Sequence, residues 1–179
     1  MIQTTHPAVV SLARELRSGT ATDEDFAARA YEWVRDEVRH SWDAQDRRVT
    51  LSASEVLDQR VGLCYAKSHL LTAVLRSQGV PAALCYQRLG DDDGGYALHG
   101  LVAVHLRGSW HRQDVRGNND NVDAQFSLGA ERLAYLVDTA RGEVDYPTLF
   151  TSAAPCVVDA LRSTDDVLAL CANGLPTEL

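Results

Sequence analysis

The stretch Gly62-Leu63-Cys64, followed by the run "YAKSHLLTAVLRS", most restricts how this chain can fold. Its apolar positions recur at helical spacing, and Gly79 and Pro81 end the pattern. The pattern predicts a buried helix with a cysteine in its first turn. A thiol at a helix N-terminus lies near oriented N–H groups that stabilise a thiolate. Cys64 is therefore a candidate nucleophile, and a plain buried thiol is the alternative.

Helices are also predicted upstream of Cys64, in residues 7–19, 22–40 and 52–59. Thr22 would cap the second, and Ser52 with Glu55 would form a capping box at the third. Downstream, strands are predicted at 80–89, 96–106 and 110–117, the last two joined by a loop at 106–109. Further helical patterns occur near 130–137 and 164–174. This order predicts an α+β fold with a small antiparallel sheet packed on the Cys64 helix.

Size and charge narrow the class of protein. A chain of 179 residues with 45% hydrophobic residues is expected to form one domain, residues 1–179. The formal net charge of −8 argues against nucleic acid or an anionic membrane as the partner, because both require a basic face. No segment approaches the ~20 apolar residues of a membrane span. The N-terminus lacks a signal-peptide core, so we expect a cytoplasmic protein.

We expect no metal or other cofactor. Four cysteines are present without a C-x-x-C pair, so a zinc site is poorly supported and free thiols are expected. Cys85, Cys156 and Cys171 fall in apolar stretches that indicate core positions. The acidic glycine-rich loop at 90–95 lacks the alternating oxygen ligands of a calcium loop and is expected to be a solvated tip.

A nucleophilic cysteine requires a base and a group that orients the base. His99 lies on the second predicted strand and Asp114 on the third. If His105 pairs with Trp110, paired position numbers sum to 215, and Asp114 becomes the diagonal neighbour of His99 on one face. A one-residue shift would turn Asp114 to the other face. Cys64, His99 and Asp114 can therefore act together only if the numbers of paired residues in these two strands add up to an odd sum.

Three blocks of the sequence, "GLCYAKSHLLTAVLRSQGVPA", "LHGLVAVHL" and "GSWHRQDVRGN", resemble the transglutaminase-like core of the papain-like cysteine enzymes. The segment "YEWVRDEVRHSWD" resembles the helix and turn that precede this core, so the resemblance covers about residues 30–118. It implies Cys64 as nucleophile, His99 as base and Asp114 as the orienting acid. Gly100 and Leu101 depart from the family's usual Ala-Trp after the histidine.

The resemblance also implies a reaction class. The Cys64 thiolate would attack an amide or ester carbonyl, form a thioester and release the amine with a proton from His99. Water or an amine would then resolve the thioester. The backbone N–H of Cys64 is one donor to the oxyanion, and Gln59 and Trp42 are candidates for the second. Tyr65 and Trp110 are candidates to line the substrate cleft, with core packing as the alternative for both.

Two functions follow as hypotheses. The first is hydrolysis of a peptide or amide bond in a peptide, protein or small amide, with transamidation as a variant. The second is a catalytically inactive module that binds a peptide or a partner, which would not need all three triad residues. The sequence does not identify the acyl donor, the acceptor or the oligomeric state. The segment "GEVDYPTLF", residues 142–150, is either a loop over the cleft or an ordinary packed connection.

Overall fold

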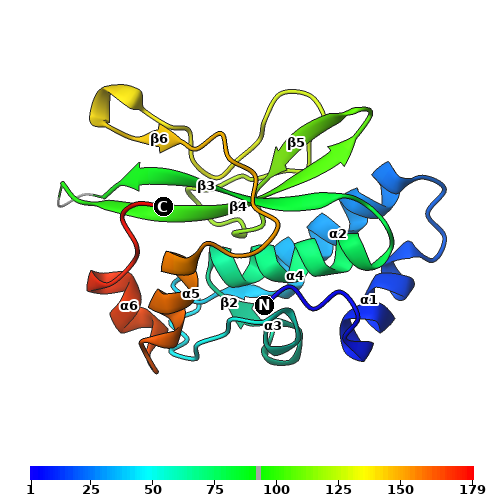
Figure 1. Ribbon diagram of the computed structural model, residues 1–179, viewed down its shortest axis with the longest axis horizontal. Coiled ribbons are helices and arrows are strands. Elements are labelled where there is room, and N and C mark those ends of the chain that lie inside the picture. Colours follow the sequence, from blue (N-terminus) through cyan, green and yellow to red (C-terminus); the bar gives the residue numbers. More distant parts are fainter. Residues whose placement is uncertain (92–93) are drawn as a thin grey trace.

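The computed structural model describes residues 1–91 and 94–179 (Figure 1). The predicted acidic tip includes Asp92 and Asp93, which lie outside the described residues. Within these residues, four antiparallel strands form a sheet in the order β5 (Ser109–Gln113), β4 (Tyr96–Leu106), β3 (Ala82–Gly90) and β6 (Val144–Asp145). The helices lie together on one side of it (Figure 1). The predicted α+β class and the packing of the Cys64 helix on the sheet are confirmed.

Three helices precede Cys64, and local signals in the sequence set their starts. They are α1 (Pro7–Arg17), α2 (Asp23–Glu37) and α3 (Ala53–Gln59). The capping box of α3 is present, and the Thr22 side chain forms a second one with Asp25. Helix α2 ends at Glu37, short of the predicted residue 40, because strand β1 (Arg39–His40) pairs in parallel with β2 (Val61–Gly62).

Helix α4 (Cys64–Ser77) lies at the centre of the protein, between the sheet and helices α1, α2 and α3 (Figure 1). Its side chains are buried on nearly every side, including those of Lys67 and His69. Gly79, at a φ of +82°, follows the helix end in a left-handed conformation that favours glycine. Among the described residues, no helix is both long and apolar enough to cross a membrane.

The central strands follow the prediction closely. They are β3 (Ala82–Gly90), β4 (Tyr96–Leu106) and β5 (Ser109–Gln113). His105 pairs with Trp110, so the predicted register sum of 215 is confirmed. The loop is shorter than predicted, because Leu106 also pairs with Ser109. Arg107 and Gly108 alone form the turn. Their φ values are both positive, 52° and 75°, as a two-residue hairpin loop requires to match the right-handed twist of the strands.

The C-terminal third wraps around the sheet and the helices. It contains a short 3₁₀ turn (Thr139–Arg141), β6 (Val144–Asp145), α5 (Pro155–Arg162) and α6 (Val167–Asn173). The predicted helix near 164–174 is confirmed by α6. The segment 142–150 runs along the outer edge of β3, where the N–H of Phe150 donates to the carbonyl of Leu84 and the reverse bond also forms. It is therefore mainly a packed connection.

The predicted helix near 130–137 is wrong, because these residues are irregular. The N–H of Ala134 donates to the Asp114 carboxylate instead of to a helical carbonyl. Leu133 is buried in a small cluster with Cys85, Leu101 and Ala103 on the face of the sheet away from the main core. Tertiary contacts therefore outweigh the local helical pattern here.

Candidate active site

Cys64 is the first residue of α4, and the backbone just before this helix packs closely against neighbouring side chains. A Cβ on Gly62 would lie 2.9 Å from Thr50 Oγ1 and 3.1 Å from Ala66 Cβ, which explains the glycine two residues before the cysteine. The N–H groups of the first turn have no acceptor within the helix. The buried Sγ accepts a hydrogen bond from the N–H of Gly100 at 3.4 Å. A helix end and a strand edge thus both face the sulfur.

His99 lies on β4 next to Gly100 and contacts both Cys64 and Asp114. Its Nε2 is 2.8 Å from Asp114 Oδ2, and its ring packs edge-on against Tyr135 with centroids 5.2 Å apart. Since Nε2 faces the carboxylate, Nδ1 is the ring nitrogen left for the thiol of Cys64, which lies close enough to raise the pKa of His99. The structure therefore brings Cys64, His99 and Asp114 together.

Asp114 directly follows β5, which ends at Gln113 and not at the predicted residue 117. Its carboxylate is completely buried. Oδ1 accepts the N–H of Arg116 and Oδ2 accepts the N–H of Ala134, each at 3.0 Å. The chain leaves the strand here so that two backbone donors can orient the carboxylate toward His99.

The charges of the three groups support one another. Burial alone would lower the pKa of His99, but the negative charges of Asp114 and Cys64 raise it well above its usual value. Burial alone would raise the pKa of Asp114, but the charge and hydrogen bond of His99 and the two backbone N–H groups hold it below its usual value. The arrangement therefore favours an imidazolium beside the Asp114 carboxylate.

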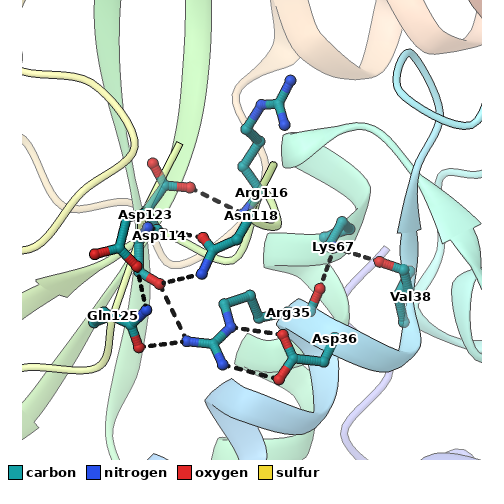
Figure 2. A network of polar contacts seen from close by, with 10 residues as sticks. Arg35, Asp36, Val38, Lys67, Asp114, Arg116, Asn118, Asp123 and Gln125 are labelled. Atoms are coloured by element: carbon teal, nitrogen blue, oxygen red, sulfur yellow. Dashed lines mark hydrogen bonds and ion pairs between the residues drawn. The ribbon is translucent and has the colours of Figure 1, made fainter. Parts of the chain in front are cut away.

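Figure 2 shows the polar network that supports the chain behind Asp114. The buried Nζ of Lys67 donates to the carbonyl of Arg35 at 3.1 Å and to that of Val38, at the end of α2. Arg35 Nη1 in turn donates to Gln125 Oε1 at 2.8 Å. Burial lowers the pKa of Lys67 to about 7. These contacts connect α2, α4 and the segment that follows Asp114.

Two further pairs hold the same segment. Arg116 forms a bidentate ion pair with Asp43, in which Nη2 lies 2.8 Å from Oδ1. Asn118 binds both backbone groups of Ala124, accepting its N–H at 2.8 Å and donating to its carbonyl at 3.2 Å. The position of Asp114 is thus fixed from several sides.

A cavity of about 1190 Å³ lies beside Cys64 and His99. Cys64 and His99 line it, together with residues from the loop at 134–136, the end of β3, and the segment 171–177. The cavity is large enough for several residues of a peptide or a small amide. Across residues 1–91 and 94–179, no group of three or more His, Cys, Asp or Glu could hold a metal ion.

Of the other candidate residues from the sequence, Trp42 and Tyr65 lie at the cavity, whereas Gln59 and Trp110 do not. Trp42 lines the cavity and is 46% exposed. Tyr65 also borders it, but its side chain is buried and its hydroxyl donates to the carbonyl of Leu98, which makes packing its main role. Gln59 ends α3, and Trp110, on β5, packs against His105 on β4, so neither is brought to the cavity.

Sequence reasoning missed several residues of the site. Tyr135 packs on His99, and its segment was assigned to a helix, so no local signal indicated it. Cys171, predicted as core, is half-buried and lines the same cavity as Cys64. Burial raises its pKa to about 11, so it is a weaker nucleophile at neutral pH. His40 lines the cavity as well.

Gly100 yields a first prediction about this site. A Cβ at residue 100 would lie 2.8 Å from Tyr65 Cδ1 and 3.2 Å from Tyr65 Cα, so Gly100→Ala must push β4 away from α4. We expect a loss of about 1–3 kcal/mol in the free energy of unfolding, measured by chemical denaturation. Gly129→Ala is the matched control, because its Cβ would meet only Ser127 Oγ at 4.0 Å. Equal denaturation midpoints for both variants and the wild type would contradict the close approach.

Comparisons with known proteins bear on the fold and on the family. No curated protein matches the sequence. A structure from Cytophaga hutchinsonii, of a protein proposed to be a cysteine protease, is 18% identical with a TM-score of 0.51, over 64% of this chain and 38% of that one. The structure of a TGase is 16% identical with a TM-score of 0.52, over 68% of this chain and 34% of that one. These likenesses concern the fold.

The chain thus spans little more than a third of either protein. The family model of the transglutaminase-like superfamily matches residues 10–115, which include Cys64, His99 and Asp114. This stretch is more than half of the 179 residues. The chain belongs to the transglutaminase-like superfamily.

Proposed function

We propose that this protein transfers acyl groups from amides or peptides through a thioester on Cys64. The proposal depends on one observation: a buried cysteine at a helix N-terminus and a histidine line a large cavity, and a buried carboxylate binds the histidine from behind. An inactive binding module would have no use for a buried, oriented carboxylate behind the histidine.

In the proposed first step, the sulfur of Cys64 attacks the substrate carbonyl carbon, and a C–S bond forms as the carbonyl π electrons move to oxygen. The C–N bond then breaks, and the leaving amine takes the proton from Nδ1 of His99. Asp114 keeps Nε2 protonated and stabilises the imidazolium charge. In the second step, His99 takes a proton from water, the hydroxide attacks the thioester, and the Cys64 thiolate is released.

Water needs no binding site of its own, so we propose hydrolysis as the main outcome. An amine that enters the cavity would resolve the same thioester by transamidation. The substrate proposed is a peptide, a protein segment or a small amide. The cytoplasmic location and the single domain stay predictions from the sequence.

The proposal is tested by trapping the acyl-enzyme. Purified protein is mixed with p-nitrophenyl acetate, quenched in acid and analysed by mass spectrometry and peptide mapping. We expect a burst of p-nitrophenolate equal to the protein concentration and one acetyl group on the peptide that contains Cys64. Added methylamine reports the share of transamidation as N-methylacetamide. No burst, or acetyl groups only on lysines, would contradict the proposal.

A further inference from the structure

The proposed reaction requires two hydrogen-bond donors for the oxyanion, and the N–H of Cys64 supplies only one. A second donor must lie near the sulfur, face the cavity and be free of other partners. Gln59 does not line the cavity, and the Trp42 side chain is half exposed to water. His40, which the sequence did not single out, lines the cavity, and its ring forms no hydrogen bond among the described residues.

Pairing of the short strands places His40 beside the nucleophile. In the parallel register of β1 and β2, His40 is opposite Gly62, two residues before Cys64. The N–H of Ser41 donates to the carbonyl of Gly62 and fixes this register. His40 lines the same cavity as Cys64 and His99, and it interacts electrostatically with His99.

The ring of His40 is buried without a hydrogen-bond partner. Its side chain is only 10% exposed, and Nδ1 is fully buried with no partner among the described residues. The nearest carboxylate oxygen, Asp43 Oδ1, is 4.0 Å from Nδ1, and Asp43 is already paired with Arg116. Nδ1 is thus enclosed by protein, so Nε2 is the ring nitrogen that can face a ligand in the cavity.

We propose that a ring N–H of His40 is the second oxyanion donor of the acyl-transfer reaction. This inference depends on the proposed function. Burial, with the positive charge of Arg116, lowers the pKa of His40 to about 3, so its imidazole is neutral. A neutral ring donates one N–H without repelling the His99 imidazolium. It gains a partner only when charge develops on the substrate oxygen, which is the condition for lowering the barrier.

Two reactions of the same sulfur separate this role from others. Acylation of Cys64 by p-nitrophenyl acetate passes through an oxyanion, whereas alkylation by iodoacetamide does not. We expect His40→Ala to slow acylation by about 10²- to 10³-fold and to change the alkylation rate by less than about threefold. His40→Gln, which keeps an N–H donor, should recover part of the loss. His99→Ala should slow both reactions.

Control variants distinguish an oxyanion donor from a residue with only a structural role. His105→Gln changes a histidine outside the cavity and should leave both rates unaltered. Equal slowing of acylation and alkylation in His40→Ala would overturn the proposal and indicate a structural role. A selective loss of acylation in Trp42→Phe, with His40→Ala unaffected, would assign the donor to Trp42 instead. Acylation of the wild type that does not require Cys64 would contradict the proposed function itself.

Discussion

Replacement of Cys64 by alanine is expected to lower the turnover of an amide or ester substrate by about 10⁴-fold or more. The thioester cannot form without the sulfur, and the other groups of the site act through it. For this reason His99→Ala should cause a similar loss, and the double variant should be no worse than either single variant. Initial rates with p-nitrophenyl acetate, and with an amide once one is identified, measure the effect.

The other cysteines provide the control and the competing nucleophile for this prediction. Cys156→Ala is the matched control, because Cys156 is half-buried and does not line the cavity. Cys171 lines the cavity and is the competing nucleophile. Retention of activity in Cys64→Ala, with loss in Cys171→Ala, would move the nucleophile to α6. Retention in both variants would show that turnover uses neither cysteine of the cavity and would contradict the proposed thioester.

Much of the fold was predictable because its signals are local. Side chains at Thr22 and Ser52 cap helices within three residues, and Gly79 ends α4 through its own backbone conformation. The register of β4 and β5 is set by the two-residue turn between them and by the alternation of side chains between the two faces of the sheet. The contact between His99 and Asp114 then follows from the register, although Asp114 itself lies beyond the strand.

The parts that the sequence did not predict depend on distant partners. Strand β6 has two residues and exists only because it pairs with β3. Residues 130–137 have a helical pattern, yet Ala134 is held by a carboxylate twenty positions earlier. The approach of His40 to Cys64 requires a parallel pair between segments separated by α3. No periodicity within either segment indicates that pairing, which is why Gln59 was the more obvious candidate.

Asp114→Asn is expected to lower turnover by about 10³- to 10⁴-fold while the protein stays folded, because the amide preserves shape but loses the charge. The asparagine can also present its NH₂ group to Nε2 and favour the wrong tautomer of His99. Since the Asp114 carboxylate raises the pKa of His99, its removal lowers that pKa. The imidazolium is then lost at lower pH, and the alkaline limb of the rate profile moves down in pH.

The stability of this variant tests the same charge independently of catalysis. The folded-state pKa of Asp114 is held below its usual value. The carboxylate therefore stabilises the fold above its unfolded pKa, and this contribution is lost as the pH falls through the folded value. Asp114→Asn lacks the titrating group, so its free energy of unfolding should fall less on acidification than that of the wild type. Asp145→Asn, at a carboxylate paired with Arg112 on the far edge of the sheet, is the matched control and should leave turnover unaltered. Parallel acid-denaturation curves for the wild type and Asp114→Asn, with an unmoved alkaline limb, would contradict a charged Asp114 behind His99.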